Sequence, residues 1–347
     1  MTVRVGFFGA GLIATYHSKM LRRSGQDVVW AGVHDPDRTR ADQFARATGA
    51  VVCDREEAVL DGCDAVYVCT WTSEHARLVA AAVERGKPVF CEKPLAVDLA
   101  TATAMTETVE AAGLANQVGL VLRSSPAFNW ARHLVEDQRS GRVMSVVFRD
   151  DQYLPVQGMY GSTWRGDPLL AGSGTLLEHS IHDVDMIEFV CGPMESVSAR
   201  TAEFHGIVGI EDVVATSFGL AGGGLGTLVS VWHDVLERPS LRHVEIFCER
   251  LWCAIEGDWF GPVRWTRAGG ESGSLDGDSL LAEVSKAGLA DQNPDGAFIR
   301  AVADGAPAQP DFASALRAHV VVDGLYRSAA AAGEPVDVSP GPRRKPT

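Results

Sequence analysis

The 347-residue sequence lacks any apolar run that approaches the roughly 20 residues needed to span a bilayer. It also lacks an excess of positive charge, since 31 lysines and arginines face 45 aspartates and glutamates, for a formal net charge of −14. An acidic chain is repelled by nucleic acid and by anionic lipid. We therefore expect neither nucleic acid nor a membrane as a partner. An anionic cofactor stays possible, because local backbone dipoles bind phosphate whatever the total charge.

Paired cysteines, internal repeats and low-complexity linkers between domains are also missing. The seven cysteines are odd in number and scattered, without a Cys-x-x-Cys pair, which favours reduced thiols in a cytoplasmic protein. The first residues run directly into a strand-like segment, so we expect no signal peptide. The length exceeds one usual hydrophobic core and predicts two domains.

Glycines are grouped at one early position. An apolar run of strand length, Val3 to Phe8, is followed by Gly9-Ala10-Gly11-Leu12-Ile13-Ala14 and a helical pattern. This is the G-x-G-x-x-G/A fingerprint in its required place between a strand and a helix. Gly9 makes the tight turn, Gly11 lets the backbone approach a pyrophosphate, and Ala14 lets the helix pack closely on the strand.

The second predicted strand, 28–33, is followed by Asp35. An acidic residue here can bind the adenosine ribose hydroxyls and repel a 2′-phosphate, which favours NAD over NADP. Arg38 and Arg40 follow closely and could reverse that preference. We interpret them instead as solvated charges on the next helix.

Strands and helices alternate through the first 120 residues. Apolar runs predict further strands at 50–53, 65–69, 89–91 and 115–122, separated by helices at 39–48, 55–61, up to residue 85, and 98–112. That spacing is typical of an α/β fold with a doubly wound parallel sheet.

Polar side chains follow the fourth and fifth of these strands. Thr70 and His75 come after the fourth strand, and Lys93 lies between Glu92 and Pro94 directly after the fifth. Ligands of open parallel sheets bind outside the carboxyl ends of the strands. A lysine held in an extended conformation by the following proline can therefore point at a bound substrate.

Taken in order, the fingerprint, Asp35, the Thr70 and His75 pair, Glu92-Lys93-Pro94 and the segment 118–123 resemble the Gfo/Idh/MocA oxidoreductases, the family of glucose–fructose oxidoreductase and inositol dehydrogenase. The resemblance covers nearly the whole chain, and Glu-Lys-Pro is its most specific mark. It implies NAD(P)-dependent oxidation or reduction of a sugar or cyclitol and a Lys-Pro bond that is often cis. It also implies cofactor contacts from Gly9, Gly11, Leu12, Ile13, Ala14, Asp35, Thr70, Trp71, His75, Glu92, Lys93, Arg123, Trp164 and Arg165.

The pattern changes from about Pro126. A helix through Gln138 precedes alternating runs typical of antiparallel strands, at 144–149, 194–204, 213–220, 225–233, 242–248 and 251–255. The triple glycine at 222–224 is expected to be a hairpin loop, and 313–332 one long helix. These features predict an α+β domain with an open, mainly antiparallel sheet.

We accordingly place an NAD(P)-binding Rossmann domain at 1–123, a substrate-binding and oligomerisation domain at 124–338, and a disordered tail at 339–347. A sheet face left apolar would be a natural oligomer surface. We therefore expect a homo-dimer or homo-tetramer that forms through the second sheet.

Chemistry-bearing residues are densest between 172 and 186. Apolar residues at helical spacing predict one amphipathic helix, entered through a glycine-rich turn. His182 lies four residues after Glu178 and three before Asp185, so we expect all three on one helix face. A carboxylate beside an imidazole raises its basicity, as a general base requires, whereas the plainer interpretation is a solvated polar face. A metal site built on His179 and His182 is not predicted, because neighbouring helical residues point in different directions.

These residues suggest a division of roles. His182 takes the hydroxyl proton, Lys93 donates a hydrogen bond to the same oxygen, and Glu178 positions the imidazole or a neighbouring hydroxyl. We predict these three as catalytic residues and His179 as a further substrate-binding residue. The segment resembles Asp-x-x-Ile-His-Asp-x-Asp-Met of inositol dehydrogenases, with Glu178 where that family usually has aspartate.

The predicted function is a cytoplasmic NAD-dependent dehydrogenase or reductase that acts on a CH–OH group of a cyclitol or sugar. One alternative is a non-catalytic NAD-binding sugar sensor, against which the presence of Lys93 and His182 counts. Another is an enzyme that recycles tightly bound NAD during epimerisation or glycoside cleavage. Such an enzyme produces no net NADH.

Overall fold

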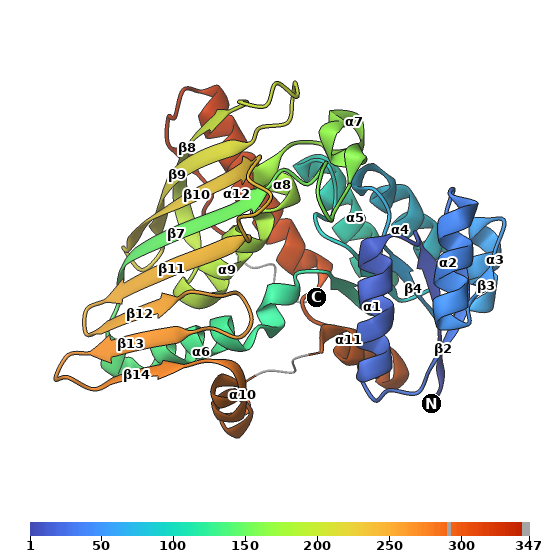
Figure 1. The fold of residues 1–347 in the computed structure, drawn as a ribbon, viewed down its shortest axis with the longest axis horizontal. Coiled ribbons are helices and arrows are strands. Elements are labelled where there is room, and N and C mark those ends of the chain that lie inside the picture. Colours follow the sequence, from blue (N-terminus) through green and yellow to red (C-terminus); the bar gives the residue numbers. More distant parts are fainter. Residues whose placement is uncertain (290–292, 342–347) are drawn as a thin grey trace. The chain divides into compact units, whose positions relative to one another are not determined.

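The computed structural model describes residues 1–289 and 293–341 (Figure 1). The chain forms two compact units, the first of Met1–Leu120, Leu169–Gly172 and Asn293–Leu316, and the second of Val121–Pro168, Ser173–Gln292 and Arg317–Thr347. Two segments distant in sequence therefore join the first unit, which the sequence analysis did not foresee. Of the tail expected at 339–347, residues 342–347 lie outside the described part. No helix in that part is long and apolar enough to cross a membrane.

The first unit is a six-stranded parallel sheet, as the alternation of strands and helices predicted. Its order is β3-β2-β1-β4-β5-β6, so the winding reverses between β1 and β4. Ligands of such sheets bind at that reversal, beyond the carboxyl ends of the strands. The strands are β1 (Val3–Phe8), β2 (Val28–His34), β3 (Val51–Val52), β4 (Ala65–Val68), β5 (Val89–Cys91) and β6 (Asn116–Val118).

Helices connect these strands and begin and end where the sequence provides caps. The side chain of Asp37 accepts hydrogen bonds at the start of α2, and that of Asp98 at the start of α5. Gly49 and Gly113 end these two helices in the left-handed conformation. The helices are α1 (Leu12–Arg23), α2 (Arg38–Thr48), α3 (Glu56–Gly62), α4 (His75–Glu84), α5 (Leu99–Ala112) and, from the later segment, α11 (Pro294–Asp304).

Aromatic packing joins α11 to the parallel sheet. The ring of Tyr67 stacks between Phe7 and Phe90, with centroid distances of 5.0 and 4.6 Å, and Phe298 of α11 meets Tyr67 edge-on. Each large ring buries apolar area worth a few kcal/mol. The returning segment is therefore part of the first hydrophobic core.

The predicted strand at 115–122 is shorter in the structure. β6 ends at Val118 because the N–H of Leu120 bonds back to the Val118 carbonyl, and a 3₁₀ turn follows over Val121–Ser124. A Cβ at Gly119 would lie 2.3 Å from Oε1 of Glu92, so only glycine fits here. The chain leaves the sheet at the point where Glu92 packs against it.

The second unit contains a nine-stranded sheet of order β14-β13-β12-β11-β7-β10-β9-β8-β15. β7 and β10 pair in parallel and the other neighbours are antiparallel, which confirms the mainly antiparallel sheet. Residues 221–224 join β9 to β10 as the expected hairpin loop. The strands are β7 (Val143–Tyr153), β8 (Met194–Ala202), β9 (Val213–Leu220), β10 (Leu225–His233), β11 (Leu241–Cys248), β12 (Leu251–Ile255), β13 (Val263–Arg267), β14 (Ser272–Leu275) and β15 (Val336–Asp337).

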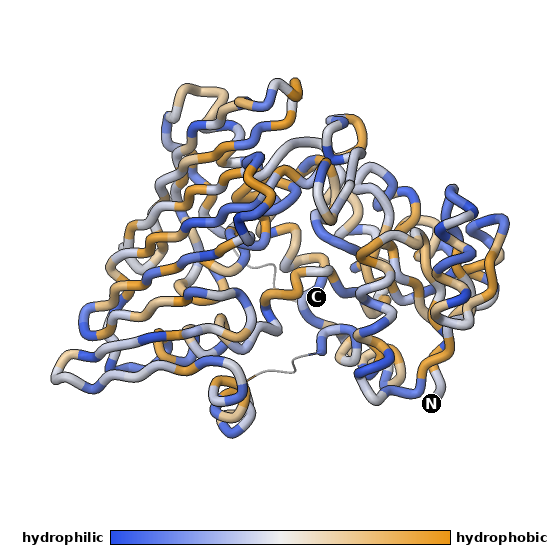
Figure 2. The backbone as a smooth tube through the Cα atoms, viewed as in Figure 1, coloured by the Kyte–Doolittle hydropathy of each residue, from blue (hydrophilic) through white to orange (hydrophobic). Residues whose placement is uncertain are grey.

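One face of this sheet packs on helices, as Figure 1 shows for α6, α9 and α12. Apolar and polar residues alternate along the strands (Figure 2), and Val146, Phe148 and Ile246 point into the core. The opposite face has a shallow hollow of about 440 Å³ lined by small residues of β7 to β10. The helices of the second unit are α6 (Pro126–Glu136), α8 (Thr175–Glu178), α9 (Ile181–Cys191), α10 (Gly277–Lys286) and most of α12 (Phe312–Ala330), whereas most of α7 (Pro168–Ala171) and the first turn of α12 belong to the first unit.

The prediction of one continuous helix through residues 172–186 is wrong. α8 ends at Glu178, α9 begins at Ile181, and His179 between them has φ −126° and ψ −60°. The hydroxyl of Ser180 bonds to Ser230 of β10 at 2.5 Å, and its backbone N–H bonds to the Thr175 carbonyl. Ser180 is the N-cap residue of α9, and its side chain bonds to β10 and not to the first turn of that helix. Glu178 and His182 therefore do not share a face of one helix.

Candidate active site

The glycine turn after β1 is formed as the sequence predicted. Gly9 has φ +87°, and a Cβ there would lie 2.4 Å from the Cys69 carbonyl oxygen, so a side chain is excluded. Gly11 is the N-cap of α1, and a Cβ there would meet no described atom within 4 Å. The backbone is therefore open where the first-turn N–H groups of α1 point, which is the geometry that binds a phosphate.

Asp35 lies at the carboxyl end of β2 and holds the glycine turn. Its carboxylate accepts from the N–H of Ala10 at 2.7 Å and from that of Asp37 at 2.8 Å. Arg38 forms ion pairs with Asp42 and Asp54. An arginine engaged by two carboxylates is a poor partner for a 2′-phosphate, which agrees with the interpretation of Arg38 as a solvated charge.

The other predicted strand-end residues lie on the same edge of the parallel sheet. Trp71 is 40% exposed, whereas His75 is almost completely buried, and its Nδ1 donates to the Pro94 carbonyl at 3.0 Å. The Lys93–Pro94 bond is cis, as the resemblance implied. His75 therefore supports the backbone turn that carries Lys93. Its contact with a cofactor stays a prediction.

A charged group that could not be read from the sequence includes Glu92, the residue before Lys93. His17 of α1 is fully buried, with Nε2 2.8 Å from Oε1 of Glu92 and Nδ1 2.8 Å from Oδ1 of Asp295. Burial alone would lower the pKa of His17, but the two carboxylates raise it to about 10. Burial alone would raise the pKa of Glu92, but the hydrogen bond and charge of His17 lower it. The three residues form a buried, hydrogen-bonded group, which we call the His17 trio.

The first unit fits a dinucleotide. The open backbone at Gly11 faces no described side chain, Leu12 and Ile13 are exposed at 57% and 38%, and Asp35 lies beside the turn. Exposed apolar residues at a helix start with uncapped N–H groups suit a ligand that has both phosphates and rings.

In the second unit, Glu178 forms an ion pair with another predicted residue. Its side chain is fully buried, and Nε of Arg165 donates to its Oε2 at 3.0 Å. The Arg165 guanidinium lies over the ring of Trp164, 4.5 Å from its centroid. The structure thus brings Trp164, Arg165 and Glu178 together within this unit.

His179 belongs to a buried cluster that the sequence did not reveal. Its Nε2 lies 2.7 Å from Oδ2 of Asp150 and 3.1 Å from Nη2 of Arg242. Arg242 also bonds Asp183 and Asp258, each at 2.6 Å. One guanidinium thus lies among three carboxylates from different segments. We call this group, with His179, the Arg242 cluster.

Asp183 is the most deeply buried carboxylate of that cluster. Its burial, with the nearby charge of Asp150, raises its pKa to about 6, against the opposing effect of Arg242. Burial also raises the pKa of Asp150. One proton of the cluster can therefore be exchanged near neutral pH.

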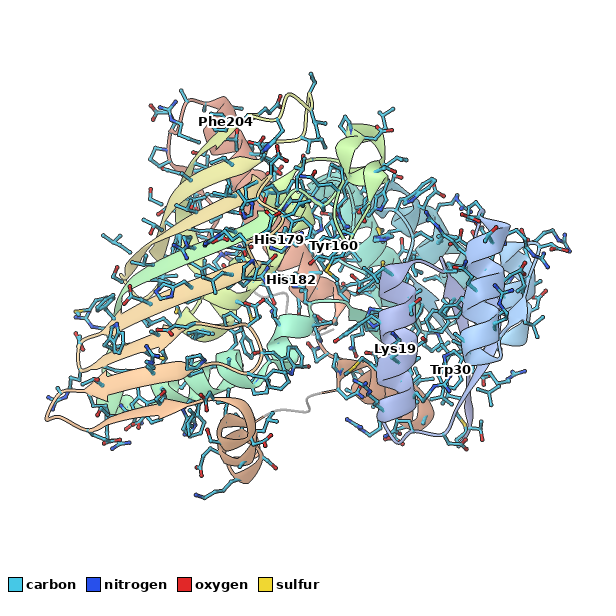
Figure 3. The ribbon with its side chains drawn as sticks, in the orientation of Figure 1. Lys19, Trp30, Tyr160, His179, His182 and Phe204 are labelled. Atoms are coloured by element: carbon cyan, nitrogen blue, oxygen red, sulfur yellow. The ribbon has the colours of Figure 1, made fainter. Side chains whose placement is uncertain are left out.

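His182 and Asp185 lie on α9, apart from Glu178 on α8. Asp185 binds Arg123 through three contacts of 2.6 to 3.1 Å, so Arg123, predicted to bind the cofactor, is engaged within the second unit. His182 is 9% exposed. In the view of Figure 3 the labelled His179 and His182 lie near Tyr160, which belongs to the turn region after β7. Lys93 belongs to the first unit.

Sequence reasoning missed His17, Asp295, Asp150 and Arg242 for one reason. Each forms its contacts with residues far away in the chain, 278 positions for His17 and Asp295. Within their own segments these residues look like ordinary charges of a helix or strand, as in the run Arg149-Asp150-Asp151 of β7. The one available signal was that charged residues interrupt otherwise alternating strands, as Asp150 and Arg242 do.

A six-stranded parallel sheet with this glycine turn defines a dinucleotide-binding domain, and comparison with known families agrees. A model described as "Oxidoreductase family, NAD-binding Rossmann fold" matches residues 3–120, and the GFO/IDH/MocA C-terminal domain matches residues 128–253. The chain belongs to the GFO/IDH/MocA oxidoreductase family.

Curated relatives share about a third of their residues with the matched parts of this chain. The 1,5-anhydro-D-fructose reductase of Ensifer adhaerens is 32% identical over 237 residues, 67% of this chain and 68% of the relative. The inositol 2-dehydrogenase of Rhizobium meliloti (strain 1021) is 33% identical over 207 residues, which cover 58% of this chain and 59% of the relative. The scyllo-inositol 2-dehydrogenase (NAD(+)) of Bacillus subtilis (strain 168) is 31% identical over 194 residues, 55% of this chain and 54% of the relative.

Solved structures share the fold over nearly the whole chain. Levoglucosan dehydrogenase in complex with NADH and levoglucosan matches with a TM-score of 0.86 and 22% identity, over 97% of this chain and 100% of the other. An oxidoreductase domain protein from Kribbella flavida matches with a TM-score of 0.84 and 24% identity, over 98% of this chain and 100% of the other. At these identities the match shows the fold alone.

The raised pKa of Asp183 predicts a pH effect on stability. The folded state binds this proton more tightly than the unfolded state, so the stabilisation is present below about pH 4 and is lost as the pH rises through about 6. Asp183→Asn keeps the size of the side chain but cannot ionise. The unfolding midpoint of the wild type should therefore fall relative to that of Asp183→Asn between about pH 4 and pH 7. Asp278→Asn, a change at an exposed aspartate, is the control, and parallel profiles of wild type and Asp183→Asn would contradict the assignment.

Proposed function

We propose that this protein is an NAD-dependent dehydrogenase or reductase that acts on a secondary alcohol or ketone of a cyclitol or sugar. The observation that carries the proposal is Lys93, which follows the carboxyl end of β5 on the sheet edge that carries the glycine turn. The names of the relatives support the substrate class, since they include inositol dehydrogenases and a reductase of an anhydro-sugar.

The residues divide the chemistry as follows. The hydride acceptor in oxidation is the nicotinamide of bound NAD, which is the chemistry that the cofactor supplies. Lys93 donates a hydrogen bond to the reacting oxygen and stabilises the negative charge that develops there. His182 accepts the hydroxyl proton, as a general base does. Glu178, held by Arg165, positions the substrate hydroxyls or the imidazole.

The contacts of the two histidines support His182 as the base, on grounds other than a shared helix face. Nε2 of His179 lies close to both Asp150 and Arg242, so that nitrogen already has its partners within the Arg242 cluster. His182 lies on the first turn of α9 and, at 9% exposed, is the more buried of the two histidines. His179 contributes to substrate binding through its half-buried ring.

The contacts of Asp35 and Arg38 favour NAD over NADP. Asp35 adjoins the glycine turn, while Arg38 is held by carboxylates.

The state of the cysteines favours a cytoplasmic location. All seven cysteines lie in the described part of the chain and none forms a disulfide, which favours a reducing compartment.

Lys93→Met tests the catalytic assignment. It should lower turnover at least about 10²-fold while NAD affinity stays nearly unchanged, because a transition-state donor is lost without loss of the phosphate site. NADH formation is followed by absorbance across a panel of cyclitols and sugars with both cofactors, and NAD binding by calorimetry. Turnover within a few-fold of wild type, with NAD binding intact, would remove Lys93 from the mechanism. Substrate conversion by the wild type without net NADH would indicate a recycled cofactor instead.

A second comparison separates the two histidines. His182→Asn should lose most activity and flatten the acidic limb of the kcat/KM profile between about pH 6 and pH 9, because the titrating base is gone. His179→Asn, its matched control, should keep that limb even if KM rises. The opposite pattern would assign the proton transfer to His179.

We also propose that the uncovered face of the second sheet binds a second copy of the chain. Its hollow is lined by Ser145, Val147, Ser217 and Thr227, and Leu225 nearby is 67% exposed. Small and apolar residues on a broad sheet face suit packing against an identical face.

Sedimentation tests this proposal. The wild type should have a mass above that of one chain, and Thr227→Arg should lower that mass because a long charged side chain enters the hollow. Glu107→Arg on α5 is the control, and a monomeric wild type would contradict the proposal.

A further inference from the structure

The His17 trio connects three segments and includes the residue before the predicted catalytic lysine. His17 lies on α1, Glu92 directly follows β5, and Asp295 is in the first turn of α11. All three belong to the first unit and are at most 6% exposed. Glu92 also directly precedes Lys93 in the chain. The charge and orientation of its carboxylate therefore determine the surroundings of the lysine.

The hydrogen bonds fit a charged imidazole. Each ring nitrogen of His17 lies 2.8 Å from a carboxylate oxygen, and an imidazolium donates from both of its nitrogens. Against the effect of burial, the two carboxylates raise the pKa of His17 to about 10, so the ring carries its positive charge at neutral pH. The Lys93 ammonium belongs to the residue that directly follows Glu92.

Each carboxylate oxygen of Glu92 has a hydrogen-bond partner. Oε1 faces His17, and Oε2 accepts from the backbone N–H of Lys93 at 3.2 Å. Gly119 leaves the space that the carboxylate occupies, since a Cβ there would overlap it. The charge of Lys93 acts on Glu92 as well and lowers its pKa. The Glu92 carboxylate thus contacts both the His17 ring and the backbone of Lys93, and it interacts with the charges of both residues.

We propose that His17, held by Asp295, is a positioning residue that keeps the buried Glu92 carboxylate ionised and oriented beside Lys93. The proposal rests on the proposed function only in that Lys93 acts on the substrate. Without the imidazolium, a carboxylate buried at this depth takes up a proton near neutral pH. Lys93 then loses its anionic neighbour, and its donor geometry is no longer fixed.

A purely structural role for His17 predicts something different. In that case, loss of the imidazole lowers stability and lowers activity equally at every pH. A role through Glu92 gives a loss of activity that depends on pH, because Glu92 regains its charge as the pH rises. The two roles also differ in whether Glu92 is protonated in the variant.

The direct test is infrared difference spectroscopy at about pH 7. The spectrum of His17→Asn minus that of His17→Asn/Glu92→Gln should contain the carbonyl band of a protonated carboxylic acid, and wild type minus Glu92→Gln should not. His34→Asn, at a histidine of the same unit whose Nδ1 bonds a backbone carbonyl, is the matched control and should resemble wild type. Absence of the Glu92 band in folded His17→Asn overturns the proposal. This readout needs no turnover, so it stands apart from a failure of the proposed function.

Kinetics supply the second readout. The kcat/KM of His17→Asn should recover at least about tenfold, relative to wild type, between about pH 6.5 and pH 9, as Glu92 deprotonates. The double variant His17→Asn/Glu92→Gln should match Glu92→Gln alone, because His17 acts through Glu92. A pH-independent loss, or additive losses, overturns the proposal.

A measurement on the wild type covers the case in which His17→Asn does not fold. With ¹⁵N-labelled histidine, both ring nitrogens of His17 should carry a proton at about pH 8, where an ordinary histidine is neutral. A neutral ring at that pH overturns the proposal without any variant.

Discussion

The placement of buried positive charge among carboxylates is the constraint on which both units depend. In the first unit one imidazolium joins Glu92 to Asp295, and in the second one guanidinium joins Asp150, Asp183 and Asp258. A buried ion left without its partner costs about 3 to 5 kcal/mol, a large part of the stability of a domain. Each cation therefore requires its segments to meet in one arrangement, in a chain whose total charge is strongly negative.

The two units provide different parts of the chemistry. The first supplies backbone geometry, with an open N–H cluster at Gly11 and a lysine at a strand end, and its charges are buried below that surface. The second supplies groups that can exchange protons, since Asp183 titrates near pH 6 and two histidines lie close by in the chain. The proposed dehydrogenase reaction would use both, because hydride transfer is coupled to movement of a hydroxyl proton.

Features set by local chain chemistry could be predicted from the sequence, and features set by distant contacts could not. Gly9 adopts φ +87°, which glycine allows without strain, so the fingerprint turn and the six strands could be predicted from the residues themselves. The cis Lys93–Pro94 bond was implied only by the family resemblance. The break after Glu178 depends on Ser230, a β10 residue 50 positions beyond Ser180, and periodicity carries no information about it. The same holds for His17, which fits the helical pattern of α1 but has its partners at positions 92 and 295.

A buried ion trio at Glu92 is a costly way to stabilise a fold, since apolar side chains of similar size often do as well or better. Its value lies in what an apolar core cannot provide, which is a fixed negative charge beside a lysine at a ligand-binding edge. Asp295 anchors the imidazolium only when α11 has packed through Phe298 against Tyr67. The ionisation of Glu92 is thereby coupled to the return of a segment that lies some 200 residues later in the chain, so the charge beside Lys93 is complete only in the fully folded first unit.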